Sequence, residues 1–385
     1  MSFRIKVYLV TLIASTLLAL SWVHQPLMWK KIPYRLQAFS VSLSGVWCED
    51  STFPDLVDLL RDHLLPNFAL EGQVIYLNRE GEVARCSVSK GGRTGGVYRL
   101  ASMTKAITAH AALVLSESGD LKLNAHLLSY FPEVDLLTVR DPFLKEVMVY
   151  QLINHSSGFG GPFGSDDMVK KGVKPWCPYD FKRLESVRLA GVPGSNYVYS
   201  NVAYCLLGEV ISRVTGLSYR QYVQDQYLEG TDIEFADGPY FPEEPNYDFS
   251  NDFRFTSAYV DWLDFWALSS SAGLVGRPEE FARLVWDKLH RDAGKLLSGS
   301  LVASCGEGVV AKCYSWNFEL EFNERGGVIA GVQQGYMPGV SSLLAITPSG
   351  QVIVWVAAGA PIENHHKVEL QKAVVEFLES RESAV

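Results

Sequence analysis

Segments typical of β-strands lie near both ends of this chain, and this placement limits the folds open to it. Residues 72–78 and 83–88 are short β-rich runs separated by a turn, the pattern of a hairpin. Residues 341–347 and 351–358 flank Pro348-Ser349-Gly350 and predict a second hairpin. We therefore expect strands from the two ends of the chain to form one antiparallel sheet.

Helical patterns lie between and beside these hairpins. Apolar residues recur at helical spacing over 53–65 and 366–379, and residues 102–117 form an Ala-rich apolar run without Pro or Gly. The fold class expected is α+β, in which helices flank the antiparallel sheet and a mainly helical lobe is inserted over roughly 110–300. A cleft between the sheet and the lobe is the expected place for a binding site.

The N-terminus has the composition of an export signal. Arg4 and Lys6 precede an uncharged, mostly apolar run from Val7 to Val23. At about 1.5 Å per residue this run would be roughly 25 Å long as a helix, just short of a bilayer core. Residues 1–24 are therefore interpreted as a signal peptide, cleaved near Ala19-Leu20-Ser21, or as a single-span signal anchor. A buried core helix is the alternative.

Residues 25–52 are expected to be a connector, and residues 53–380 a single domain. On either export interpretation this domain lies outside the cytoplasm, in the periplasm or another extracytoplasmic space, with residues 7–23 as a candidate membrane tether. The net charge of −9 comes without a block of Lys and Arg, which excludes nucleic acid as a partner.

Six cysteines fit an oxidising compartment, although six cysteines allow fifteen pairings. Cys305 and Cys313 are close enough in sequence to bridge a short loop, and Cys48 with Cys86 would tie down the N-terminal segment. Cys205 lies in an apolar helical stretch and is expected to be a buried thiol. The sequence lacks the Cys and His spacings of zinc sites, so no metal is predicted.

Ser102 and Lys105 stand at the start of the apolar helix. Positions i and i+3 share a helix face, so the lysine amine can reach the serine hydroxyl. A serine becomes a nucleophile when a base takes its proton, and a desolvated lysine can be that base. The same spacing in Ser87-Val88-Ser89-Lys90 falls at a strand end, where the two side chains do not share a helix face.

Tyr199-Ser200-Asn201 provides the second candidate group. A tyrosine beside a lysine can pass a proton from the nucleophile to a leaving group. An asparagine amide can hold the lysine and also bind a substrate amide. A similar triplet, Tyr76-Leu77-Asn78, lies inside the first hairpin, where these residues read as ordinary strand residues.

From about residue 53 to 378 the chain resembles the serine β-lactamase and penicillin-binding-protein superfamily, in particular class C β-lactamases with their related esterases and D-amino-acid peptidases. The resemblance implies a β-lactamase/transpeptidase-like fold. The matching segments, in chain order, are Ala101–Lys105, Glu117–Leu123, Phe131–Glu133, Leu152–Phe159, Pro193–Asn201, Leu207–Ile211, Thr215–Gly216, Ala272–Val275 and Pro338–Ser342.

The resemblance also implies roles for individual residues. Ser102 would be acylated, Lys105 and Tyr199 would share the acid–base work, and Asn201 would line the substrate cleft. The oxyanion hole would use the backbone N–H groups of Ser102 and Tyr336. No metal or organic cofactor is implied.

The third motif departs from the family pattern. Lys-Thr-Gly or His-x-Gly is usual there, whereas this chain has Gln333-Gln334-Gly335. We expect Gln333 and Gly335 to contact substrate, but a neutral Gln333 provides no charge to attract a substrate carboxylate. Arg325 or Lys312 could substitute for the missing cation.

The sequence therefore predicts an exported serine hydrolase acting through an acyl-serine on a small-molecule or peptide substrate. The candidate substrates are a cell-wall D-amino-acid peptide, a small ester or, less favoured, a β-lactam. The alternative is a membrane-tethered, non-catalytic binding protein that keeps the fold. His155 is expected to be structural rather than part of a Ser-His-Asp triad, and Asp166-Asp167 to be solvated.

Overall fold

The computed structural model describes residues 3–24, 26–49, 53–67, 69–88, 96–160, 168, 173–238, 263–298, 313–337, 339–359 and 364–382. An eight-stranded sheet runs through the domain in the order β1-β3-β2-β11-β10-β9-β8-β7. Every pairing in this sheet is antiparallel. The strands are β1 (Val46–Cys48), β2 (Gly72–Leu77), β3 (Val83–Val88), β7 (Cys313–Ser315), β8 (Phe318–Phe322), β9 (Val328–Met337), β10 (Val340–Ile346) and β11 (Val352–Ala357).

The two predicted hairpins meet at the centre of the sheet. Gly72 pairs with Ala357 and Leu77 with Val352, so β2 from the N-terminal half lies directly against β11 from the C-terminus. Every residue of β2, β10 and β11 is buried, because helices cover both faces of these strands. The α+β fold class, with one antiparallel sheet built from both ends of the chain, is confirmed.

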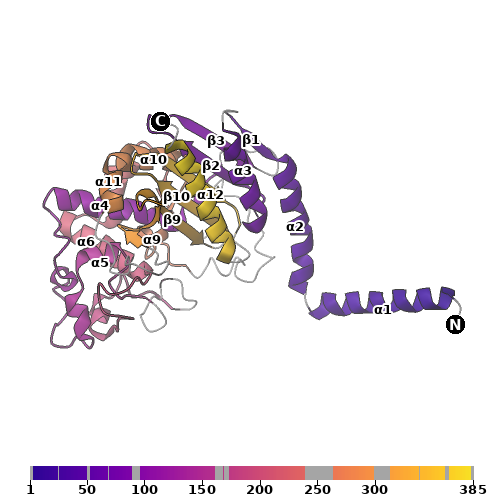
Figure 1. Ribbon diagram of the computed structural model, residues 1–385. Coiled ribbons are helices and arrows are strands. Elements are labelled where there is room, and N and C mark those ends of the chain that lie inside the picture. The colour runs from indigo at the N-terminus through magenta and orange to yellow at the C-terminus, as the bar shows by residue number, and fades with distance from the viewer. Residues whose placement is uncertain are drawn as a thin grey trace.

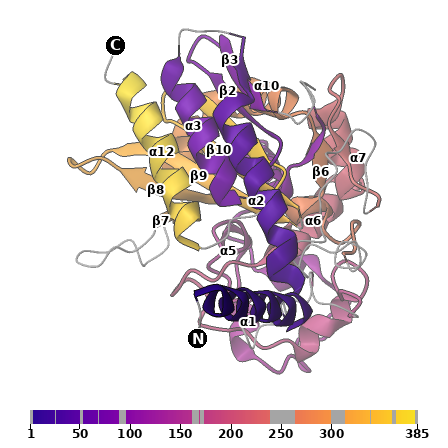
Figure 2. The same ribbon diagram turned by 90° about the vertical axis from the view of Figure 1, so that its right-hand side faces the viewer.

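One face of the sheet is covered by α3 (Pro54–Leu64) and α12 (Asn364–Glu382). Leu60 and Leu378 from these helices pack with Tyr76 and Trp355 from the strands in one apolar cluster. α2 (Pro26–Ser44) lies beside α3 on the same side (Figure 2).

The opposite face carries the helical lobe, whose core surrounds α4 (Figure 1). The α-helices here are α4 (Thr104–Glu117), α5 (Val149–Ile153), α6 (Asn201–Thr215), α7 (Tyr219–Val223), α9 (Ser269–Ala272), α10 (Pro278–Leu289) and α11 (Ala293–Ser298). The short 3-10 or π segments are η1 (Leu65–Asn67), η2 (Ala101–Met103), η3 (Leu127–Tyr130), η4 (Pro142–Glu146), η5 (Phe181–Ser186), η6 (Gln224–Leu228) and η9 (His290–Asp292). A small sheet of β4 (Tyr98–Arg99), β6 (Leu274–Gly276) and β5 (Glu234–Phe235) completes the lobe.

The N-terminal segment is more ordered than a connector. α1 (Phe3–His24) projects away from the domain, and α2 follows it after a bend (Figure 1). β1 then pairs with β3, so the sheet begins before residue 53, where the sequence placed the start of the domain. Within the described part of the chain, no helix combines the length and the apolar character that a membrane crossing requires.

Two disulfides join described cysteines. Cys48 and Cys86 face each other across β1 and β3 and are bonded, which is one of the pairings that the sequence left open. The prediction that Cys205 is a free buried thiol is wrong, because Cys205 on α6 is bonded to Cys177. The two cysteines come from distant segments that only the packing of the lobe brings together. Cys305 and the side chain of Cys313 lie outside the described residues, so their predicted bridge stays a prediction.

Candidate active site

The candidate nucleophile stands at the junction of β4 and α4. Ala101 adopts a positive φ of 49°, a strained conformation for a residue with a side chain. This kink turns the chain into η2, so that Ser102 precedes the first residue of α4 and keeps 8% of its surface exposed. Strain of this kind persists only where the surrounding structure holds it, and it is common at functional sites.

Two of the predicted groups converge on the Ser102 hydroxyl, and a third holds one of them. The Tyr199 hydroxyl lies 2.5 Å from Ser102 Oγ, and Lys105 Nζ donates to Ser102 Oγ at 3.2 Å. Lys105 Nζ also donates to Asn201 Oδ1 at 2.9 Å. The four residues therefore form one hydrogen-bonded network in which the phenol and the amine both reach the serine.

Lys105 is fully buried at 0% exposure, which is unusual for a lysine. A third acceptor, the backbone carbonyl of Ser271, receives a hydrogen bond from Nζ at 2.8 Å. The amine also lies 4.8 Å from the ring centre of Tyr199 and 5.3 Å from that of Tyr204. These acceptors and ring faces offset the free-energy cost of removing the amine from water.

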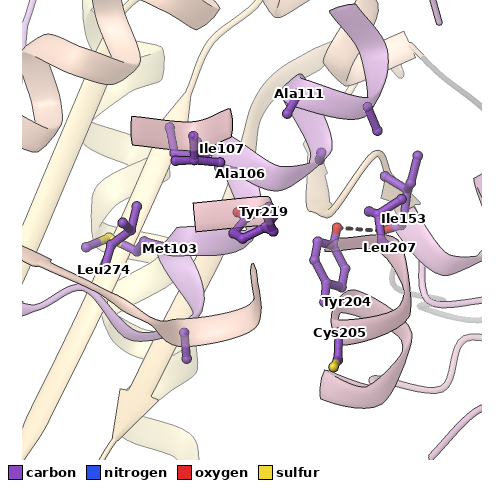
Figure 3. Packing of buried hydrophobic residues seen from close by; sticks show 14 of the residues in the cluster. Met103, Ala106, Ile107, Ala111, Ile153, Tyr204, Cys205, Leu207, Tyr219 and Leu274 are labelled. Carbon is purple, nitrogen blue, oxygen red and sulfur yellow. Dashed lines mark hydrogen bonds between the residues drawn. The ribbon is translucent and has the colours of Figure 1, made fainter. Parts of the chain in front are cut away.

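The packing of α4, α6 and α9 sets the position of the Ser271 carbonyl. Thr108 on α4 donates to the carbonyl of Ser270 at 2.7 Å, and Ser270 Oγ donates to the carbonyl of Tyr204 on α6 at 2.8 Å. Gly208 on α6 permits this approach, since a Cβ there would lie 2.6 Å from Ser270 Oγ. Figure 3 shows apolar side chains of α4 and α6 in the core of the lobe, among them Ala106 and Ile107 on α4 and Tyr204 and Leu207 on α6. Ser271 is not recognisable as a site residue from the sequence, because any residue type offers a backbone carbonyl.

His155 holds the loop that carries Tyr199. Its Nδ1 accepts a hydrogen bond from the backbone N–H of Ser200 at 3.2 Å, and its carbonyl accepts from Val198 N at 2.8 Å. The imidazole also packs against the Tyr199 ring, with centroids 4.5 Å apart. Burial, together with the nearby Lys105 charge, holds the pKa of His155 well below its ordinary value. The histidine is therefore a neutral positioning residue, as expected.

The turn between β7 and β8 meets His155 from the sheet side. Trp316 and Asn317 both have positive φ there, and Asn317 is fully buried. Burial lowers the pKa of His155, whereas the Asn317 side chain acts to raise it. Beside this turn, Tyr314 stacks on Tyr197 with ring centroids 3.6 Å apart. This hairpin was not among the segments predicted to contribute to the site.

β9 passes directly beside the nucleophile. A Cβ on Gly335 would lie 2.9 Å from the backbone N of Ser102 and 2.3 Å from Ser342 Oγ, so the position accepts only glycine without rearrangement. Gln333 points to the same face of β9 as Gly335, because side chains alternate along a strand. Its amide donates to the carbonyl of Gln334 at 2.7 Å.

The Tyr336 side chain lies on the other face of β9. Its hydroxyl donates to Gln334 Oε1 at 2.6 Å, and Gln334 Nε2 donates to the carbonyl of Lys367 on α12 at 3.1 Å. Lys367 Nζ lies 4.0 Å from the Tyr336 ring centre. Only the backbone of Tyr336 is therefore available to the site.

The structure separates the remaining candidates from the site. Arg325 is exposed in the turn before β9 rather than beside Gln333. The Tyr76 hydroxyl donates to Gln351 Oε1, and its ring packs in the cluster under α3 and α12, on the opposite face of the sheet. Other predicted candidates fall outside the described residues, namely Lys312, Asp166-Asp167 and Ser89-Lys90.

One family model and several known proteins are similar to this chain. The family model described as Beta-lactamase matches residues 71–363. A curated relative, "Probable fimbrial assembly protein FimD, serogroup H1" of Dichelobacter nodosus, is 24% identical over 270 residues, which cover 70% of this chain and 68% of the relative. "Protein flp" of Staphylococcus aureus is 33% identical over 133 residues, which cover 34% of this chain and 26% of that protein.

Solved structures share the fold at low sequence identity. The D-amino acid amidase of Ochrobactrum anthropi, complexed with L-phenylalanine amide, superposes with a TM-score of 0.65 at 17% identity and covers 86% of this chain and 98% of the amidase. The β-lactamase/D-alanine carboxypeptidase of Yersinia pestis, complexed with citrate, gives a TM-score of 0.61 at 16% identity and covers 85% of this chain and 99% of that chain.

Proposed function

Because this chain belongs to the beta-lactamase family, we propose that it is a serine hydrolase that cleaves an amide or ester carbonyl through an acyl-Ser102 intermediate. The observation that carries the proposal is the fully buried Lys105 amine, which donates to both Ser102 and Asn201 while the Tyr199 phenol lies 2.5 Å from the serine hydroxyl. Such an arrangement is costly to bury and serves to activate a hydroxyl.

The reaction follows from these positions. Ser102 Oγ attacks the carbonyl carbon as its proton passes to the Tyr199 oxygen, which takes part as a phenolate. The Lys105 ammonium stabilises the negative charge of this phenolate before it takes up the proton. The backbone N–H groups of Ser102 and Tyr336 receive the oxyanion. Tyr199 then gives the proton to the leaving amine or alcohol. A water molecule, deprotonated by the same group, releases the acyl chain and restores Ser102.

We propose that the preferred substrates lack a free carboxylate next to the scissile bond. Gln333 is neutral, and Arg325 lies in a distant turn. Among the described residues, Lys367 approaches β9, but it lies over the Tyr336 ring on the α12 side. Amides of D-amino acids, end-blocked peptides and small esters fit this site, whereas β-lactams and peptides with a terminal carboxylate are poorer substrates.

An activity-based probe tests the nucleophile. We expect a fluorophosphonate to add one covalent adduct to Ser102 of the wild type and none to Ser102→Ala, as measured by mass spectrometry of the intact chain and its peptides. An adduct that persists in Ser102→Ala would overturn the assignment.

A substrate panel tests the specificity. We expect short-chain esters and D-amino-acid amides to be hydrolysed faster than nitrocefin, and Gln333→Lys to raise turnover of carboxylate-bearing substrates relative to neutral ones. A wild type that already prefers carboxylate-bearing substrates would contradict this.

A non-catalytic binding role is the second candidate, and the neutral Gln333 in place of the usual cation is the observation that favours it. The two functions differ in one assay. Turnover of a chromogenic ester by the wild type, lost in Lys105→Ala, supports the hydrolase and excludes the binding role.

We further propose that the protein is exported. The Cys48–Cys86 and Cys177–Cys205 disulfides support an oxidising compartment. The basic start and apolar run of residues 4–23 support the same destination. Protease accessibility of the domain in intact cells, compared with lysed cells, tests this placement.

A further inference from the structure

The α2 helix has one face packed on the domain and one apolar face that nothing described covers. On the inner side Ala38 is fully buried and Ser42 keeps 7% exposure, while Val41 packs against the cluster under α3. The outer side presents four large apolar residues, which are Ile32 at 42%, Leu36 at 64%, Phe39 at 50% and Leu43 at 68% exposure.

These four residues, called here the α2 stripe, form one continuous strip. Their spacing of four, three and four residues places them within about 60° of arc at 100° per residue. The exposed polar residues Gln37 and Ser40 lie to one side of the strip. A continuous exposed strip of large apolar side chains marks an interaction surface, unlike single apolar residues scattered over a surface.

The charge of this segment indicates the kind of partner. Residues 1–48 contain five Lys or Arg residues and no Asp or Glu, although the whole chain has a net charge of −9. A basic segment with an apolar face is attracted to anionic lipid headgroups. It would be repelled by a second copy of itself, which disfavours a dimer through the same stripe.

α1 extends the apolar surface on the same side. It leaves the domain in the direction that the outer face of α2 points (Figure 1). Its exposed apolar residues include Leu12, Leu17 and Leu20, distributed around the helix. Where α1 meets α2, the rings of Trp22 and Trp29 lie 5.8 Å apart, and tryptophan is enriched where proteins meet the headgroup layer.

We propose that residues 3–44 dock the protein on a bilayer that contains anionic lipids, with α2 parallel to the surface and the α2 stripe in the acyl boundary. α2 is packed on α3, so its contact with lipid fixes how the domain sits on the membrane. The proposal does not depend on the reaction at Ser102, because it uses a different surface and a different measurement.

Lipid titration of the full-length protein tests the docking surface. The test variant is Leu36→Glu/Leu43→Glu. The matched control, Leu136→Glu/Leu137→Glu, makes the same change at two leucines of the helical lobe that are 51% and 93% exposed. Vesicles of phosphatidylcholine alone or with 30% phosphatidylglycerol are titrated, and the partition constant is measured by co-sedimentation. The binding free energies of α1 and α2 add, so their contributions to the partition constant multiply. Weaker lipid binding by α2 therefore lowers the measured constant even if α1 binds lipid on its own.

We expect wild type and control to bind the anionic vesicles more tightly than the neutral ones. The α2 variant should lose at least about 10-fold in partition constant, because two leucines leave the acyl boundary and two negative charges meet an anionic surface. Circular dichroism confirms that both variants remain folded.

Three results would overturn the proposal. One is a wild type that does not bind either vesicle, and the second is an α2 variant that binds as tightly as the control. The third is a lipid-free dimer, seen by sedimentation velocity, that the α2 variant dissociates while the control does not. In that case the stripe is occupied by a second copy of the chain.

Discussion

Gly335 shows how strongly a single residue type can be required beside the nucleophile. Its missing side chain lets β9 approach the backbone N of Ser102, which a Cβ would meet at 2.9 Å. We expect Gly335→Ala to push β9 away and to lower ester hydrolysis by about 100-fold, since the oxyanion donors would move apart. Steady-state kinetics measure the loss, with Gly191→Ala as control because a Cβ there meets nothing within 4 Å. Equal activity of the two variants would contradict this account.

His155 links stability to pH. The folded state keeps the ring neutral, since burial and Lys105 hold the pKa of His155 well below 6.5, whereas the unfolded chain takes up a proton below that pH. The unfolded state then binds more protons, so the free energy of unfolding falls as the pH falls, by up to about 1.4 kcal/mol per pH unit. We expect urea unfolding between pH 7 and 5 to show this decline and His155→Gln to flatten it. A variant with an unchanged slope would show that other groups cause the decline.

The site residues that act through their side chains could be predicted from the sequence, and those that act through their backbone could not. Ser102, Lys105, Tyr199 and Asn201 carry their chemistry in their side chains, and the structure brings all four together. The carbonyl of Ser271 could not be predicted, because any residue offers a backbone carbonyl.

At the scale of elements, contact between α6 and α9 sets the geometry of the lysine. A Cβ on Gly208 would lie 2.6 Å from Ser270 Oγ, so Gly208→Ala should displace α9 and with it the Ser271 carbonyl that holds Lys105 Nζ. We expect kcat to fall about 10- to 100-fold with little change in KM, because the lysine is misplaced rather than the substrate. Gly294→Ala is the control, as a Cβ there meets nothing within 4 Å. A change confined to KM would argue against the explanation.

Elements with strong periodicity were predicted well, and elements built by distant contacts were not. The predicted helix over 102–117 and the strands at 72–78 and 351–358 agree with α4, β2 and β11 to within a few residues. β1 was missed because it has only three residues, and its pairing with β3 depends on a register that no local pattern encodes. The β7–β8 hairpin was also missed. β7 has only three residues, but the alternation of apolar and acidic residues over Phe318–Phe322 is a strand pattern that the sequence does carry.

At the scale of the whole molecule, the Cys48–Cys86 disulfide fastens the edge of the sheet to its interior. It closes a loop between cysteines 38 residues apart, for which chain entropy predicts roughly 3–4 kcal/mol of stabilisation. We expect Cys48→Ser/Cys86→Ser to lose about that much in urea unfolding and to keep ester turnover under native conditions, because β1 does not contact Ser102. Loss of activity in the folded double variant would show that the edge also shapes the site.

The order of the strands has a consequence for biosynthesis. β2 has no partner on one side until β11 is made, and Ser102 leaves the ribosome long before Gly335 on β9. A nascent chain therefore carries Ser102 without the strand that completes the pocket, and we expect it to hydrolyse no substrate until β9 has been made. A nonsense mutation before β11 should therefore leave an inactive product, because β2 would lack its partner strand.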